Sequence, residues 1–132
     1  MVIDTSAIVA IIFAEPERRT FLDMLASEIP LSLSAVTFYE SSVVVTGKKR
    51  DRAAVRFVDG LIDHFTIEIV PVDMDHSVAA REAYFKFGRG WHVAGLNFAD
   101  CFSYSLAKTR NEPLLFKGDD FLKTDIVPAW RP

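Results

Sequence analysis

Four short apolar segments, separated by longer helical patterns, constrain the fold of this chain most. The segments are Val2-Ile3-Asp4, Leu31-Ser32-Leu33, Phe65 to Val70, and Leu114-Leu115-Phe116. Strands that alternate with helices and are apolar throughout are typical of a parallel sheet covered on both faces. The sequence therefore predicts an α/β protein with three layers (α/β/α) and a mostly parallel central sheet.

Helical patterns occupy the intervals between these segments. The predicted helices are Ala7 to Ala14, one starting at Pro16, Ser34 to Lys48, one burying Val55 to Ile62, one capped by Asp75, and one that begins at Asn97. No repeat, low-complexity stretch or linker divides the 132 residues. A chain of this length suits one core, so a single domain over residues 1–132 is expected.

The charge balance limits how this protein can meet nucleic acid. Half of the residues are hydrophobic and a quarter are charged, which is the composition of a globular protein. The formal net charge is −3. Bulk attraction to nucleic acid is therefore absent, and such a partner needs a local basic patch or bound metal ions.

The single cysteine and the hydropathy pattern indicate the cellular compartment of the protein. Cys101 has no partner cysteine in the sequence, so the fold needs no disulfide and fits a reducing cytoplasm. No apolar run approaches the roughly 20 residues that a membrane span requires. The segment Met1-Val2-Ile3-Asp4 is strand-like and not a basic export leader. We expect a cytoplasmic protein without a membrane anchor.

Five acids follow or precede the predicted strands, and each has an ordinary structural explanation. Asp4 can cap a helix, and Thr37 with Glu40 has the spacing of a capping box. Asn97 and Asp100 repeat that spacing. The remaining two acids, Asp119 and Asp120, suit a turn or a helix N-cap.

Taken together, these acids predict more than capping. In a parallel sheet, most of them reach the edge where the strands end, which is where such folds bind ligands. Glu40 also lies on a mostly apolar helical stripe, where an unpaired charge is costly. Two carboxylates about 4 Å apart repel by roughly 4 kcal/mol at an effective dielectric constant near 20. Lys117 can neutralise only one of them.

A cluster of oxygen donors without histidine or cysteine suits Mg²⁺ or Mn²⁺ better than zinc. Such ions lower the pKa of a bound water and stabilise charge on a phosphoryl oxygen. The cluster therefore indicates hydrolysis of a phosphodiester.

At this point the residues resemble a known family, the PIN-domain ribonucleases, and more narrowly the VapC-type toxins of type II toxin–antitoxin systems. The resemblance covers the whole chain in order. It is carried by Val2-Ile3-Asp4-Thr5-Ser6-Ala7, Glu40, Leu96-Asn97-Phe98-Ala99-Asp100-Cys101, and Leu114 to Phe121.

The resemblance implies an α/β/α fold and a Mg²⁺- or Mn²⁺-dependent endoribonuclease that leaves a 5′-phosphate and a 3′-hydroxyl. Its partners would be RNA, a second copy in a homodimer, and a cognate antitoxin whose tail crosses the active-site groove. Asp4, Glu40 and Asp100 match the first three family acids. Asp120 fits the fourth, with Asp119 as the alternative. The family often places Ser or Thr just before its last acid, but here that region holds Phe116, Lys117 and Gly118, and Thr5 or Ser6 would supply such a polar group beside Asp4.

Further residues are candidates for supporting functions. Asn97 can orient the metal site or simply cap its helix, and Trp91 and Trp130 can stack on bases, although buried packing is the simpler expectation. Cys101 is expected to be a core thiol. Cations that can meet RNA are Arg89, His92, Lys108, Arg110 and Lys117.

One apolar set exceeds what a small core needs and predicts a partner surface. It consists of Ile8, Ile11, Ile12, Phe13, Phe38 and Val45.

Three alternative functions fit the sequence less well. A phosphoacceptor domain of the response-regulator type, or a haloacid-dehalogenase phosphatase, would need paired acids after the first strand, and Asp4-Thr5-Ser6 has one. A non-catalytic PIN-like module would be expected to have lost acids that are present here.

Overall fold

A computed structural model of the protein describes residues 1–27 and 29–131. The elements follow in the predicted alternation of strands and helices. They are β1 (Val2–Ile3), α1 (Thr5–Ile12), α2 (Arg18–Leu25), β2 (Ser32–Ser34), α3 (Ala35–Lys49), α4 (Val55–His64), β3 (Glu68–Val70), α5 (Met74–Phe87), α6 (Phe98–Arg110) and β4 (Leu114–Leu115), with 3₁₀ turns at Arg52–Ala54 and Phe121–Lys123.

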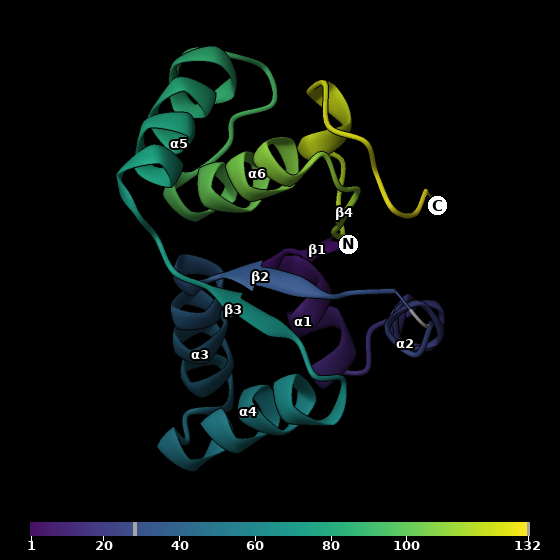
Figure 1. Cartoon of the computed structure of the whole chain (residues 1–132). Coiled ribbons are helices and arrows are strands. Elements are labelled where there is room, and N and C mark those ends of the chain that lie inside the picture. The colour runs from purple at the N-terminus through teal and green to yellow at the C-terminus, as the bar shows by residue number, and fades with distance from the viewer. Residues whose placement is uncertain (28, 132) are drawn as a thin grey trace.

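Within these residues the strands form one sheet in the order β3-β2-β1-β4, and every neighbouring pair is parallel. The first and last of these strands are neighbours, since Val2 pairs with Leu114 and Ile3 with Leu115, and β4 forms one edge of the sheet. Figure 1 shows α5 and α6 on one face of the sheet and α1, α3 and α4 on the other. The predicted α/β/α architecture with a parallel sheet is confirmed.

Neighbouring strand residues point to opposite faces, so each face has its own core. Paired residues share a face: Val2 and Leu114 pack toward one side, and Ile3 and Leu115 toward the other. Burying such a side chain contributes about 1.5–3 kcal/mol. The core under α5 and α6 includes Leu96, Leu106 and Phe116, and the core under α1 and α4 includes Ile8, Phe21, Leu33 and Val58.

The N-cap residues predicted from the sequence are confirmed for two helices and wrong for two. Asp4 caps α1, and Asn97 caps α6 in a full capping box with Asp100, as predicted. The predicted box of Thr37 and Glu40 is wrong, because Ser34 at the end of β2 already caps α3. The helix α5 is capped by Asp73, which leaves Asp75 in its first turn.

The two tryptophans differ in how they are packed. Trp130 packs edge-on against Phe21 with ring centroids 5.3 Å apart, as expected of a packed side chain. Trp91 is 68% exposed, so the expectation that it is buried was wrong. Cys101 is buried, as predicted. In the described part of the chain, no helix is long and apolar enough to cross a membrane.

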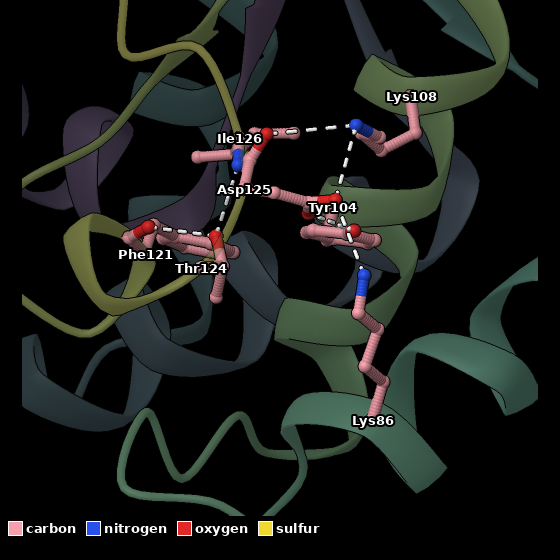
Figure 2. A network of polar contacts seen from close by, with 7 residues as sticks. All are labelled: Lys86, Tyr104, Lys108, Phe121, Thr124, Asp125 and Ile126. Carbon is pink, nitrogen blue, oxygen red and sulfur yellow. Dashed lines mark hydrogen bonds and ion pairs between the residues drawn. The ribbon is translucent and has the colours of Figure 1, made fainter.

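A polar network ties the segment after β4 to the helices beside it (Figure 2). The hydroxyl of Tyr104 in α6 donates to Asp125 Oδ1 at 2.5 Å. Lys86 Nζ of α5 and Lys108 Nζ of α6 lie 3.2 and 3.5 Å from Asp125 Oδ2. The pKa of Asp125 is lowered to about 2, and the hydrogen bond from the Tyr104 hydroxyl is the largest cause. This network secures the segment that follows Asp119 and Asp120.

Replacing Tyr104 by phenylalanine should loosen this attachment. We expect Tyr104→Phe to reduce stability by about 1 kcal/mol, since the hydrogen bond is lost and Asp125 is partly exposed to water. For a protein of this size that lowers the melting temperature by roughly 3–6 °C. Tyr39→Phe, which removes a hydroxyl from an exposed tyrosine, is the matched control and should melt like the parent.

The same variant tests the pKa of Asp125. Because the folded-state pKa lies below the ordinary value of 3.8, the stabilisation is present above that pH and is lost as the pH falls toward 2. The difference in melting temperature between Tyr104→Phe and the parent should therefore shrink between pH 5 and pH 2. An equal difference at both would contradict the network.

Candidate active site

Asp4 is the most buried of the predicted site acids. It follows β1 directly, and its side chain caps α1 by accepting from Ser6 N at 2.9 Å and Ser6 Oγ at 2.6 Å, both through Oδ2. The residue is 2% exposed, and Oδ1 is buried without a hydrogen-bond partner. A buried carboxylate oxygen that has no partner is costly, so this atom is suited to a cation.

Ser6 also joins the ends of the neighbouring strands β1 and β4. Its Oγ accepts a hydrogen bond from Lys117 N at 2.9 Å, and Asp4 N donates to Leu115 O at 2.9 Å. The residues after β1 and after β4 are thereby held together at the edge where both strands end.

Glu40 projects from the second turn of α3 and is half-buried. Its Oε2 accepts a 2.5 Å hydrogen bond from Thr5 Oγ1, which comes from the first residue of α1. Burial raises the pKa of Glu40 above its ordinary value, and the charge of Asp4 raises it further, while the Thr5 hydroxyl opposes both. Thr5 thus fixes Glu40 beside Asp4.

Asp100 belongs to the capping box at the start of α6. Its Oδ2 accepts from Asn97 N at 2.7 Å, and Asn97 Oδ1 accepts from Ala99 N and Asp100 N at 2.8 and 2.9 Å. Burial raises the pKa of Asp100 to about 7, and the charges of Asp4, Glu40 and Asp120 add to that rise. These four acids therefore share one electrostatic environment, although the sequence separates them widely.

The two adjacent acids after β4 differ in this respect. The charge of Asp120 raises the pKa of Asp100, whereas Asp119 is not among the causes of that rise. Both are exposed, and Lys123 Nζ lies 3.3 Å from Asp119 Oδ2 and 3.5 Å from Asp120 Oδ1. Asp120 precedes the 3₁₀ turn without a capping hydrogen bond from its side chain, so the capping interpretation of this residue is wrong.

The predicted supporting residues fall into two groups. Thr5, Ser6 and Asn97 each hydrogen-bond a site acid. Lys117 does not, because its Nζ lies 2.7 Å from Glu15 Oε2 and 2.9 Å from Glu17 Oε2, in the turn between α1 and α2. The idea that Lys117 neutralises one of the five site acids was wrong.

The other predicted cations are mostly engaged elsewhere. Arg110 forms a two-pronged ion pair with Glu68, and Lys108 pairs with Asp125. His92 Nδ1 accepts from Ala94 N within its own loop. Arg89 is exposed in the same glycine-flanked loop.

Glu15 and Glu17 also reach this edge of the sheet and were not predicted from the sequence. The available signal was the Glu15-Pro16-Glu17 turn, which places two acids on either side of a helix break. Their contacts with Lys117 bring the first connection of the fold to the end of β4.

The donor set fits Mg²⁺ or Mn²⁺ in its chemistry. All candidate donors are carboxylate oxygens, and each of Asp4, Glu40 and Asp100 uses Oδ2 or Oε2 for its protein hydrogen bond. Among residues 1–27 and 29–131, no three acidic, histidine or cysteine side chains already enclose a metal site. Magnesium commonly keeps several waters and needs only one or two protein carboxylates. Asp4 Oδ1 with Asp100 would satisfy that requirement.

Comparison with known proteins decides the family. The family model of the PIN domain matches residues 1–127. The chain is also 40% identical over 127 residues to Ribonuclease VapC of Mycolicibacterium smegmatis, a match that covers 96% of this chain and 98% of that protein. The chain belongs to the PIN-domain family. Within it, the chain groups with the VapC ribonucleases, as the sequence predicted, and not with phosphoacceptor domains.

Solved structures show the same fold. The Mycobacterium tuberculosis toxin VapC20, described as cleaving the sarcin–ricin loop, superposes with a TM-score of 0.78 at 19% identity and covers 99% of this chain and 98% of its own. A toxin–antitoxin complex from Klebsiella pneumoniae superposes at 0.66 and 17% identity, covering 94% and 92%. The PIN-domain VapC fold is confirmed along nearly the whole chain.

The predicted apolar partner surface needs correction. Ile8, Ile11 and Val45 are buried in the core, since they are at most 3% exposed. Ile12, Phe13 and Phe38 are only partly buried and pack against that core. The surplus of apolar residues therefore builds the layer between α1 and α3 and supplies little free surface.

The raised pKa of Asp100 predicts a pH-dependent instability in metal-free protein. Its pKa is 3.8 ordinarily and about 7 in the fold. The folded state therefore holds a proton that the unfolded state has lost between these values, and stability falls as the pH rises through this window. Asp100→Asn should remove that fall while keeping an acceptor for Asn97 N.

In EDTA at pH 8, Asp100→Asn should melt roughly 3–6 °C above the parent, and near pH 4 the two should melt alike. The exposed Asp59→Asn on α4 is the control and should match the parent at both pH values. A lower melting temperature for Asp100→Asn at both would show that capping, and not charge, dominates at this residue.

Proposed function

We propose that residues 1–132 form one PIN domain that acts as a divalent-metal-dependent endoribonuclease, the toxin of a toxin–antitoxin pair. The observation that carries the proposal is the buried, unpartnered Oδ1 of Asp4 in the same electrostatic environment as Asp100, whose pKa is raised to about 7. We assign the acid set as Asp4, Glu40, Asp100 and Asp120. Asp119 is second choice for the fourth position.

The chain's own residues would hold the acids ready for a phosphodiester. Ser6 holds Oδ2 of Asp4, Thr5 holds Oε2 of Glu40, and Asn97 N holds Oδ2 of Asp100. Each acid is thereby oriented through one oxygen and can use the other. This fixed orientation reduces the rearrangement needed when substrate binds.

A Mg²⁺ or Mn²⁺ ion bound by these acids would neutralise charge on the scissile phosphate and lower the pKa of a bound water. Hydrolysis forms a bond from the water oxygen to phosphorus and breaks the bond from phosphorus to O3′. One proton of the water would pass to one of the acids, and O3′ would take up a proton from solvent and leave as a hydroxyl. The products are a 5′-phosphate and a 3′-hydroxyl.

Partner proteins form a second part of the proposal. The solved Klebsiella neighbour is a toxin–antitoxin complex, which supports an antitoxin as the inhibitor of this chain. We also propose a homodimer. Exposed apolar side chains that a partner can cover include Tyr39 and Val43 on α3 and Phe57 on α4, which are 69%, 50% and 42% exposed. An RNA substrate and the unpaired thiol of Cys101 support a cytoplasmic location.

The acid assignment is tested by charge removal. Asp100→Asn should lower the rate of RNA cleavage at least 100-fold, in keeping with loss of a preorganised electrostatic group. Asp59→Asn is the matched control and should cleave at the parent rate. Circular dichroism establishes that both variants are folded. An Asp100→Asn protein with the parent's rate would refute the site.

Metal dependence is tested with the unmodified protein. EDTA should abolish cleavage of RNA, and excess Mg²⁺ or Mn²⁺ should restore it, because the carboxylates then regain a cation. Sequencing the fragment ends should find 5′-phosphates. Cleavage that persists in EDTA, with 2′,3′-cyclic phosphate ends, would instead mean attack by the RNA 2′-hydroxyl.

A further inference from the structure

A cavity of about 530 Å³ lies between α5 and α6, outside the acid cluster. Figure 1 shows these two helices packed together on one face of the sheet. The volume lies within the range of roughly 300–1,000 Å³ that is usual for small-ligand sites. Six of its lining residues bear on what it binds: Arg81, Tyr84, Arg89, Asn97, Phe98 and Phe102.

The cavity has a fixed aromatic wall. Phe98, at the first position of α6, is 72% exposed, and its ring lies 5.3 Å from that of Phe102. Phe102 is itself held by His76, whose ring packs edge-on at 5.4 Å and whose Nε2 lies 3.1 Å from Phe102 O. Folding does not require an exposed phenylalanine at Phe98, because its ring stays largely in water. A supported, exposed ring is a surface on which a planar group can stack.

The charge of the lining is positive. Among the described residues that line the cavity there are two arginines and no carboxylate. Arg81 Nε is 3.6 Å from Glu82 Oε1, and both side chains are at least 60% exposed, so this ion pair is weak. Arg89 follows Gly88, and the Tyr84 hydroxyl donates to Arg89 O at 3.3 Å, which restrains the loop. In a protein of net charge −3, this lining suits an anionic ligand.

The cavity is connected to the acid cluster through one residue. Asn97 lines it, and Asn97 N donates to Asp100 Oδ2 at 2.7 Å. A phosphodiester bound at Asp100 would therefore lie beside a residue that lines the cavity. A planar base, together with the phosphates on either side of it, matches an aromatic wall with two arginines.

We propose that this cavity binds one unpaired base of the RNA strand next to the scissile phosphate. Phe98 stacks on the base, and Arg81 and Arg89 neutralise the flanking phosphates. This inference rests on the proposed ribonuclease function and adds to it a subsite for one base beside the scissile phosphate.

Binding can be measured without cleavage. In an Asp100→Asn background, a fluorescein-labelled single-stranded RNA oligonucleotide of random sequence should bind about 5- to 100-fold more weakly to Phe98→Ala, the range expected for loss of one stacked base. Phe98→Leu should show a similar loss, because it keeps apolar bulk without a ring, and Phe98→Tyr should restore affinity. Phe85→Ala, an exposed phenylalanine on α5 that does not line the cavity, is the control.

Removing the two arginines should change the salt dependence of RNA binding. Arg81→Ala with Arg89→Ala should reduce the slope of log affinity against log salt by about 1.4, because each phosphate contact on a single strand contributes about 0.7. Phe98→Ala should leave that slope unchanged. Unchanged affinity in Phe98→Ala, or equal losses in Phe98→Ala and Phe85→Ala, would overturn the base site and leave the cavity to a protein partner.

Cleavage assays test the base site and the proposed ribonuclease function separately. With an intact Asp100, Phe98→Ala should raise KM for the random RNA and weaken the base preference at one position beside the cut, as read by sequencing the fragments. Cleavage by the parent, with unchanged KM and preference in Phe98→Ala, refutes the base site alone. No cleavage by the parent in Mg²⁺ or Mn²⁺ refutes the ribonuclease proposal itself.

Discussion

The burial of Asp4 at the end of β1 is the constraint on which the surrounding structure depends. A carboxylate that is 2% exposed destabilises a fold unless its oxygens are bound, and here one oxygen is held by Ser6 while the other has no partner. Ser6 in turn receives the backbone of Lys117, and Asp4 N bonds to Leu115 O. The bonds that allow one charge to be buried therefore also fix the junction of β1 and β4.

The sequence was a good guide where local and global preferences agreed. Apolar strands alternating with helices predicted the parallel sheet, and the Asn97–Asp100 spacing predicted a capping box that the structure contains. The Thr37–Glu40 box failed because Ser34, three residues earlier, ends β2 and caps α3 first. Spacing alone does not reveal which of two possible caps is used. That choice depends on where the preceding strand ends.

Side-chain direction was less predictable than position. Lys117 is close to the acid cluster in sequence, yet its backbone bonds Ser6 while its ammonium group reaches Glu15 and Glu17. Asp119 and Asp120 are neighbours that no pattern can rank, and only the three-dimensional field at Asp100 favours one of them. Apolar excess was also ambiguous, because a residue such as Ile8 meets a partner or a core depending on which helix covers it.

The pairing of Val2 with Leu114 has a consequence for how the acid cluster is assembled. The neighbouring strands β1 and β4 are the first and the last strands of the sheet in the sequence, so the sheet is complete only when these distant segments have met. Contacts this distant in sequence also form slowly compared with local ones. Asp4 follows β1 directly, whereas Asp120 reaches the same edge only when β4 has paired with β1. A chain without β4 would therefore lose a strand of the sheet and the fourth acid together.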